Sequence, residues 1–190
     1  MKPFILASKS PRRRELIELL DCSFETVSPN TKENMPAAET PEEVAIALAL
    51  KKVRSVQNDY RDRLILGCDT VVEVDGRLLG KPKNEEDAYA MLCTLSDRTH
   101  RVVTGCVLVE GVREKRFFGD AKVTFGKISD NEIRSYIKSE EPFGKAGAYA
   151  IQGRAAKFVE HIEGDYYSVM GLPVAQVYRF LKNYENGKLF

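Results

Sequence analysis

One nearly continuous apolar run constrains the fold more than any other feature of this 190-residue sequence: Leu64-Ile65-Leu66-Gly67-Cys68. A strand of this kind is buried on both faces, and such strands occur in sheets that are covered by helices on both sides. Phe4-Ile5-Leu6-Ala7 predicts another short buried strand, which leads into a helix with apolar residues at 16, 17, 19 and 20. The two segments together predict strands and helices packed around one core.

Strand-like and helix-like segments alternate along the rest of the chain. Apolar runs predict strands at residues 24–27, 101–110 and 115–125, and residues 71–74 continue the strand of residues 64–68. Capping residues and helical spacing predict helices that begin at Pro41, after Asn84, near 130 and near 173, with short strands between the last two. Asp75-Gly76 and Gly111 predict hairpins. We therefore predict an α/β fold, a mixed sheet with flanking helices, in a single domain over residues 1–190.

Composition narrows the classes of partner. The chain has 29 basic and 28 acidic residues, whereas nucleic-acid binders usually carry a large basic excess. No apolar stretch approaches the roughly 20 residues that span a bilayer, and the N-terminal apolar segment is too short for a signal peptide. We expect a cytoplasmic protein with no membrane or nucleic-acid partner. The cysteines lack zinc or redox spacing and are interpreted as buried free thiols: Cys22, Cys68, Cys93 and Cys106.

The segment Ser8–Arg14 breaks a rule that the other predicted helices obey. Ser10 suits an N-cap and Pro11 suits the first helical position, but three arginines follow where the helix dipole favours acids. Free N–H groups, the dipole and guanidinium groups would together bind a phosphate. On this basis Arg13→Glu is expected to stabilise the protein in the absence of ligand. Arginines that point into solvent are the alternative.

Asp69 places a carboxylate directly after the apolar run at 64–68. Its desolvation is costly unless a metal ion, a water molecule or N–H groups pair with it. A turn residue that bonds to its own backbone is the alternative. Lys81, in Gly80-Lys81-Pro82, and Lys52, on the apolar side of its helix, are weaker candidates for phosphate contacts.

These residue types together predict phosphoryl chemistry with a divalent cation. Mg²⁺ typically binds one or two carboxylates together with substrate phosphates and waters, and basic groups clamp the phosphates. The absence of a Walker-type or kinase-like glycine loop argues against those classes. His100 and His161 lie in strand-like stretches away from the candidates, and we interpret both as structural.

A series of motifs runs along the chain: LASKSPRRRELIELL, LALKKV, GCDTVV, GKP, LSDRTHRVVTG, KAGAYAIQG and GDYYSVMGLP. In this order they resemble the Maf family, which was first named for septum formation and is now regarded as a group of nucleoside triphosphate pyrophosphatases. The resemblance implies two lobes around a deep cleft, in a fold class shared with inosine triphosphate pyrophosphatases. It also implies hydrolysis between the α and β phosphates with a divalent cation (Mg²⁺, Mn²⁺ or Co²⁺).

The resemblance extends to single residues. Asp69 matches the family's catalytic proton acceptor, and Glu33 with Asp69 is expected to bind the metal. The remaining active-site positions of the family, which contact substrate, are matched by Ser8, Arg12, Arg13, Lys52, Lys81 and Gln152. Lys32 stands where the family often has an acidic residue, and Val53 where it usually has alanine.

Within the family, the chain is similar to the branch that hydrolyses dTTP and UTP. It has Arg12, Thr70 and Gln152 where the 7-methyl-GTP branch tends to have an aromatic residue, glutamine and glutamate. The expected role is house-cleaning of pyrimidine triphosphates, modified ones included, and the family commonly forms homodimers. Three alternatives stay open: a 7-methyl-GTP preference, a nucleotide-binding regulator of cell division with incidental catalysis, and single-stranded nucleic-acid binding by the three arginines.

Overall fold

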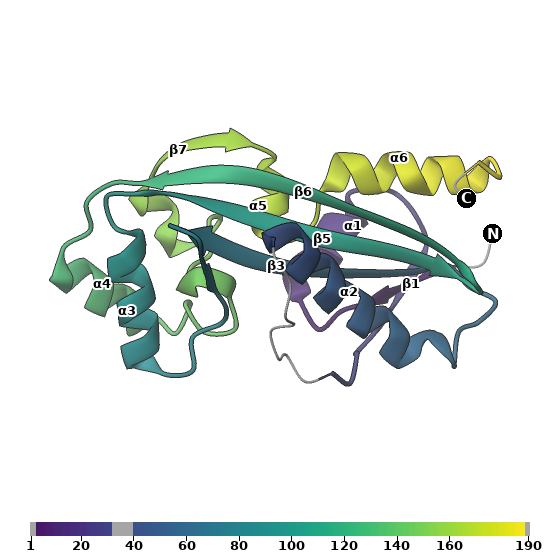
Figure 1. The fold of residues 1–190 in the computed structure, drawn as a ribbon, viewed down its shortest axis with the longest axis horizontal. Helices are drawn as coiled ribbons and strands as arrows, with labels where there is room; N and C mark the ends of the chain where they lie inside the picture. The colour runs from purple at the N-terminus through teal and green to yellow at the C-terminus, as the bar shows by residue number, and fades with distance from the viewer. Residues whose placement is uncertain (1–2, 32–39, 189–190) are drawn as a thin grey trace. The chain divides into compact units, whose positions relative to one another are not determined.

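A computed structural model describes residues 3–31 and 40–188. Seven strands form one sheet in the order β2-β1-β3-β5-β6-β7, with β4 paired to β3 (Figure 1). β1 runs parallel to β2 and β3, whereas β4 and β7 run antiparallel to their neighbours β3 and β6. The predicted mixed α/β fold is confirmed.

The elements follow one another along the chain as β1 (Phe4–Ala7), α1 (Pro11–Glu18), β2 (Phe24–Val27), α2 (Pro41–Gln57), β3 (Ile65–Val74), β4 (Arg77–Leu79), α3 (Glu85–Leu95), β5 (Thr99–Glu110), β6 (Arg113–Phe125), α4 (Asp130–Ile137), the 3-10 helices η1 (Ala146–Ala148) and η2 (Arg154–Phe158), β7 (Val159–Gly164), α5 (Tyr166–Met170) and α6 (Val174–Glu185).

Two local predictions were wrong. Leu19 does not belong to the apolar face of α1, because the helix ends at Glu18 and Leu19 is 61% exposed. The chain turns there, with Asp21 in the left-handed region at φ 50°. Between α4 and α6 we expected several short strands, but η1, η2 and α5 occupy most of that stretch and β7 is the one strand in it.

The chain divides into two compact units, which are described separately. The first unit contains Met1–Asp69, Thr104–Gly119 and Gly171–Phe190, and the second contains Thr70–Val103 and Asp120–Met170. In the first unit, α2 packs on an apolar cluster built from β1, β3 and β5. A capping box at Thr40 and Glu43 fixes the start of α2, with 3.3 Å between Glu43 N and Thr40 Oγ1.

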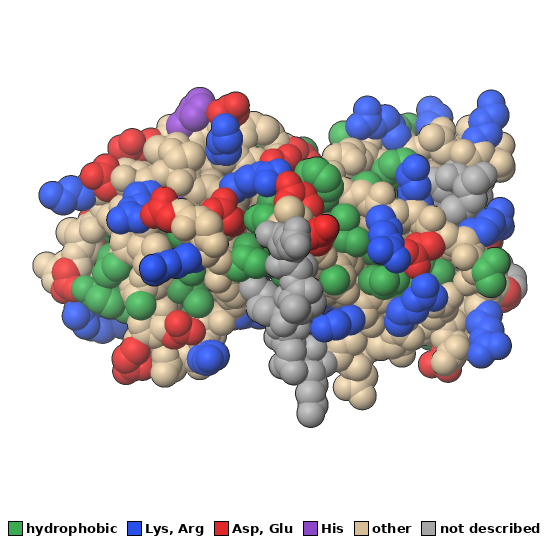
Figure 2. Space-filling view, viewed as in Figure 1, with side chains coloured by type: hydrophobic (Ala, Val, Ile, Leu, Met, Phe, Trp, Pro, Cys, Tyr) green, Lys and Arg blue, Asp and Glu red, His purple; other side chains and the backbone are tan. Residues whose placement is uncertain are grey.

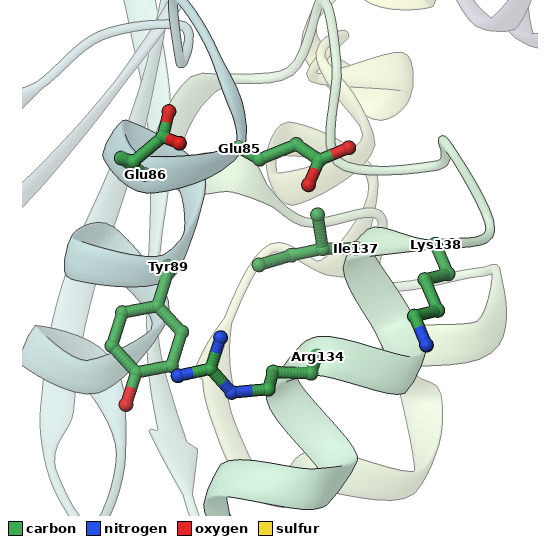
Figure 3. A pocket seen from close by; sticks show the side chains of 6 residues that line it. All are labelled: Glu85, Glu86, Tyr89, Arg134, Ile137 and Lys138. Atoms are coloured by element: carbon green, nitrogen blue, oxygen red, sulfur yellow. The ribbon is translucent and has the colours of Figure 1, made fainter.

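The second unit has its own core beneath α3 and α4, which lie side by side (Figure 1). A cavity of about 310 Å³ opens between these helices (Figure 3), lined by Glu85, Glu86, Tyr89, Arg134, Ile137 and Lys138. None of the site residues predicted from the sequence lines this cavity. It is therefore separate from the chemistry that the motifs predict.

His100 lies in the core of the second unit, as a structural histidine should. Its Nε2 is 2.8 Å from the hydroxyl of Tyr149, and its ring meets that of Phe125 edge to face at 4.9 Å. Nδ1 is buried without a hydrogen-bond partner among the described residues. Burial lowers the pKa of His100 from its ordinary 6.5 to about 4.

We expect this shift to make the protein less stable in mild acid. The folded protein keeps His100 neutral, whereas the unfolded chain binds a proton below pH 6.5, so stability falls as the pH drops from 6.5 towards 4. The loss is of order 3 kcal/mol over this window. Urea unfolding of the wild type at a series of pH values measures it. His100→Gln should flatten the pH dependence, because glutamine takes up no proton in this range. A pH profile unaffected by His100→Gln would contradict the assignment.

Two further expectations meet the structure here. No helix in the described part of the chain is long and apolar enough to cross a membrane. The four cysteines are free thiols, but the prediction that all are buried was wrong. Cys68 and Cys106 are buried, whereas Cys93 is exposed on α3 and Cys22 is half-buried after α1, because these two lie outside the apolar strands.

Candidate active site

Buried charge marks the site. Within residues 3–31 and 40–188, the buried side chains that carry a full charge at neutral pH are Arg13, Lys52 and Asp69, each at most 8% exposed. All three were predicted as site residues from the sequence, and so was Ser8, which is also buried. The four belong to the first unit. Charged side chains are almost never fully buried unless they are paired, because removing a charge from water costs free energy.

Lys52 and Asp69 form a buried ion pair. Lys52 Nζ donates to Asp69 Oδ1 at 2.5 Å and to the carbonyl oxygen of Cys68 at 3.3 Å. The desolvation of two charges consumes much of their mutual attraction, so such a pair adds little net stability but costs much if one partner is lost. The alternative of Asp69 as a turn residue that bonds to its own backbone does not fit, since Asp69 lies within β3 and its carboxylate accepts from Lys52.

Two glycines allow α2 to bring Lys52 to this position. A Cβ on Gly67 of β3 would lie 2.6 Å from Val53 Cγ2 and 2.7 Å from the carbonyl oxygen of Ala49. A Cβ on Gly105 of β5 would lie 2.5 Å from the carbonyl carbon of Ala45. The helix therefore rests almost directly on the strand backbones. This close contact brings Lys52 to Cys68 and Asp69, in the middle of β3.

The strand register places Ser8 and Asp69 at similar levels of neighbouring strands. Ala7 of β1 pairs in parallel with Gly67 of β3, so Ser8 and Asp69 both follow the same level of neighbouring strands. Ser8 Oγ accepts a hydrogen bond from Ser10 N at 3.1 Å, which shapes the turn into α1. Ser10 occupies the N-cap position as predicted, but its side chain makes no capping hydrogen bond. The carboxyl ends of strands are the usual place for ligands in α/β sheets.

The three arginines of α1 have different environments. Arg14 is exposed and pairs with Glu18 at 3.1 Å, so for this residue the solvent alternative holds. Arg12 is half-buried. Arg13 is buried, and its Nε donates to the carbonyl oxygen of Gly171 at 2.7 Å.

The contact of Arg13 overturns one expectation. We expected Arg13→Glu to stabilise the free protein by removing a cation from the helix start. Because Arg13 is buried and hydrogen-bonded to Gly171, a glutamate there would lose this bond and bury an acceptor against a carbonyl oxygen. We now expect that substitution to destabilise the protein. Arg13 has a structural partner, so the charge of the helix start no longer argues that Arg13 binds an anion, and a phosphate contact of Arg13 rests on the family resemblance.

The charges of this unit act on one thiol. Burial raises the pKa of Cys68, the Cys106 thiol at 3.2 Å lowers it, and Arg13 and Lys52 lower it further, for a net decrease. Asp69 acts in the opposite direction. Arg13, Lys52 and Asp69 thus share one electrostatic environment around Cys68, although Arg13 comes from a different helix than Lys52.

The second unit carries the other predicted residues that the structure describes: Thr70, Lys81 and Gln152. Gly147 N donates to the carbonyl oxygen of Gly80 at 3.0 Å, directly before Lys81. Gln152 lies on the same continuous segment, five residues after Gly147, and is exposed. One segment therefore supports the Lys81 loop and carries Gln152. Glu33 lies outside the described residues.

Sequence reasoning missed a buried hydroxyl and the two glycines. Thr104 of β5 is fully buried in the first unit, beside Gly105. A threonine and a glycine inside the apolar run of β5 were the available signal, since a strand buried on both faces favours large aliphatic residues.

The donor set fits a hard divalent cation only in part. Asp69 offers a carboxylate of the kind that Mg²⁺ prefers. Among the described residues, no group of three His, Cys, Asp or Glu side chains could hold a metal ion. Mg²⁺ sites often combine one or two carboxylates with substrate phosphates and waters, and the residues present are compatible with that pattern.

Comparison with known proteins identifies the family of this chain. The model of the Maf-like protein family matches residues 3–184. The chain belongs to the Maf family. A dTTP/UTP pyrophosphatase of Bacillus cytotoxicus is 46% identical to this Maf chain over 187 residues, covering 98% of both proteins. A protein of the same description from Bacillus mycoides is 44% identical over 98% of this chain and 97% of its own length.

Solved structures resemble this Maf protein in fold. The Ham1 protein of Staphylococcus aureus matches with a TM-score of 0.54 at 12% identity, covering 96% of this chain and 99% of that one. A HAM1 protein from Coxiella burnetii matches with a TM-score of 0.53 at 17% identity, covering 96% and 100%. These similarities support the fold class and no more.

Proposed function

We propose that this chain is a metal-dependent nucleoside triphosphate pyrophosphatase that converts dTTP and UTP to the monophosphate and pyrophosphate. Two relatives that share at least 44% of its residues over nearly the whole length have the name dTTP/UTP pyrophosphatase. The observation that carries the proposal is the buried Lys52–Asp69 pair at 2.5 Å, which belongs to the first unit and lies in the middle of β3. Buried, precisely paired charges of this kind are typical of catalytic sites rather than of cores.

Asp69 is the catalytic residue in this proposal. Its carboxylate accepts a proton from the water that attacks the α phosphorus, and Lys52 holds the carboxylate in one orientation. Asp69 and Glu33 would hold the divalent cation (Mg²⁺, or Mn²⁺ or Co²⁺), which stabilises the negative charge of the phosphates as a Lewis acid. The products leave as nucleoside monophosphate and pyrophosphate.

Basic and hydroxyl groups bind the substrate. Arg13 and Lys81 contact the polyphosphate, and Ser8 and Lys52 lie close to it at the strand ends. Arg12 is shared between phosphate and base. Removal of one of these contacts weakens the binding of a triphosphate more than that of a monophosphate, because the triphosphate offers more oxygens to the same cations.

Base selection rests on Arg12, Thr70 and Gln152. Uracil and thymine present one ring N–H and carbonyl oxygens, and the amide of Gln152 both donates and accepts along such an edge. An ionised glutamate at that position only accepts, which suits the N–H donors of a guanine edge. A site built around such bonds discriminates strongly, because a wrong base leaves buried polar groups unpaired.

We also propose where the enzyme acts, how it assembles and which partners it lacks. We place the enzyme in the cytoplasm, as a homodimer in which residues 1–190 act as one catalytic domain. Nucleic acid and membranes are not partners. The net charge of +1 agrees with this. In Figure 2, acidic and basic side chains are mixed around α3, α4 and β7, and Lys and Arg predominate around α2 and α6. Its role is the removal of pyrimidine triphosphates, including modified ones.

A product-resolved assay tests the function. With Mg²⁺, Mn²⁺ and Co²⁺ in turn, we expect dTTP and UTP to yield monophosphate and pyrophosphate, and 7-methyl-GTP to react poorly. Gln152→Glu should lower kcat/KM for UTP by roughly 10-fold or more while the exposed position leaves the unfolding midpoint nearly unchanged. Release of orthophosphate, or binding without turnover as in a regulator, would refute the proposal. A preference for 7-methyl-GTP would refute its pyrimidine selectivity.

A further inference from the structure

Gln152 lies in a tight turn of the second unit. Gly153 N donates to the carbonyl oxygen of Ala150 at 3.0 Å, which closes a four-residue turn with Ile151 and Gln152 at its centre. Ile151 is buried in the core, whereas Gln152 is exposed. The buried side chain of Ile151 therefore anchors the turn, and the turn exposes the amide of Gln152 at the surface of the second unit.

A tyrosine and a glutamate hold this turn on both sides. The hydroxyl of Tyr136, on α4, accepts a hydrogen bond from Ala150 N at 3.2 Å and donates one to Glu141 Oε1 at 2.9 Å. The other oxygen of the same carboxylate, Glu141 Oε2, accepts from Arg154 N at 3.1 Å. The residue that opens the turn and the residue that follows it are thus joined through two side chains.

We call Tyr136 and Glu141 the clamp of this turn, and both side chains are closely packed. Tyr136 is 3% exposed, and its ring meets Phe158 edge to face at 5.6 Å. The carboxylate of Glu141 lies against the backbone of Gly153, where a Cβ would be 2.5 Å from both of its oxygens. The glycine that follows Gln152 is therefore needed by the glutamate that holds the turn.

We propose that Tyr136 and Glu141 are positioning residues that set base selectivity by fixing the turn that carries Gln152. This inference rests on the proposed function, because it assigns the cause of the selectivity proposed above. Neither residue contacts substrate in this proposal. They act through Gln152, since a hydrogen-bonding amide discriminates between bases only where it is held in place.

Tyr136→Phe tests the clamp. It keeps the ring and removes the hydroxyl, so Ala150 N and Glu141 each lose a partner. We expect KM for UTP to rise roughly 5- to 10-fold, and the preference for UTP over 7-methyl-GTP in kcat/KM to fall by a similar factor. Since Asp69 and Lys52 belong to the other unit, kcat for UTP should stay within about threefold of the wild type.

Tyr89→Phe is the matched control. Tyr89 also donates to a carboxylate of the second unit, Asp130 Oδ1 at 2.6 Å, but this bond does not involve the turn. Both substitutions remove a phenol–carboxylate hydrogen bond, but Tyr136→Phe also takes a partner from Ala150 N, so the two variants are compared well below both of their unfolding midpoints. Only Tyr136→Phe should change the selectivity. Equal selectivity in the two folded variants would overturn the proposal.

Glu141→Gln provides a second test if Tyr136→Phe does not fold. The amide oxygen can still accept from Arg154 N, and the amide NH₂ can donate to the Tyr136 hydroxyl, but both bonds are weaker because they lose the charge of the carboxylate. Its effect on selectivity should therefore be smaller than that of Gln152→Ala and in the same direction. If Gln152→Ala narrows the selectivity and Glu141→Gln does not, the clamp fails and the proposed function stands. If Gln152→Ala itself leaves the selectivity unchanged, the proposed base recognition fails.

Discussion

Asp69→Asn should lower the turnover of UTP by ~10²–10⁴-fold, the usual contribution of a positioned proton acceptor. The side chain keeps its size and one oxygen that accepts from Lys52, but it can no longer take a proton from water. Steady-state release of pyrophosphate with Mg²⁺ measures the effect. KM should change much less than kcat, since the phosphate-binding residues stay in place.

The structure modifies one part of this expectation. From the sequence alone, the asparagine variant would fold as well as the wild type. Because Lys52 is buried and paired with Asp69, the variant keeps a buried cation with a weaker partner, and its unfolding midpoint should fall. Turnover must therefore be compared well below that midpoint. Asp120→Asn is the matched control, since Asp120 pairs with Arg101 at 2.7 Å in the second unit. Wild-type turnover in folded Asp69→Asn would show that Asp69 is not the proton acceptor.

Lys52→Met should lower the free energy of unfolding by roughly 3–5 kcal/mol, the cost of removing one partner of a buried ion pair. Methionine fills similar space, so the loss comes mainly from the uncompensated carboxylate of Asp69 rather than from a cavity. Urea unfolding followed by circular dichroism measures it. The same variant should lose most of its activity, because Asp69 is no longer oriented.

The double variant Lys52→Met with Asp69→Asn separates the charge from the packing. With both charges removed, much of the lost stability should return, so the double variant should be more stable than Lys52→Met alone. Arg54→Met, on the same helix, is the control. Arg54 is half exposed and pairs with Glu114 at 2.8 Å, a surface pair worth about 0–1 kcal/mol. Additive losses in the double variant would mean that the pair is not energetically coupled.

The elements with regular patterns could be predicted from the sequence. The apolar run of β3 and the Asp75-Gly76 turn gave the central strand and its hairpin, and Asn84 marked the start of α3. The segment around η1 could not be predicted in this way. Gly147 and Ala148 both have positive φ, near 68° and 60°, and Gly147 packs against Val72 from a distant part of the chain. Such conformations depend on tertiary contacts that a local pattern does not contain.

The same distinction applies to the site. Asp69 and the cations of α1 were recognisable because they break local rules of burial and of helix charge. That Lys52 pairs with Asp69, and that Arg13 binds the carbonyl oxygen of Gly171, follows only from the packing of α2 and of the segment before α6. Family resemblance named these residues, but the contacts of each were not contained in the motifs.

The glycines under α2 restrict how the gene for this protein can change. Any single-nucleotide substitution that replaces a glycine codon encodes a residue with a Cβ or a stop. At Gly67 and Gly105 every such residue would bring a carbon into the side chain or backbone of α2. A single-nucleotide substitution that replaces either glycine is therefore not neutral. A lineage could leave glycine there only after a prior change had moved α2 away from the sheet, and that change would already have separated Lys52 from Asp69.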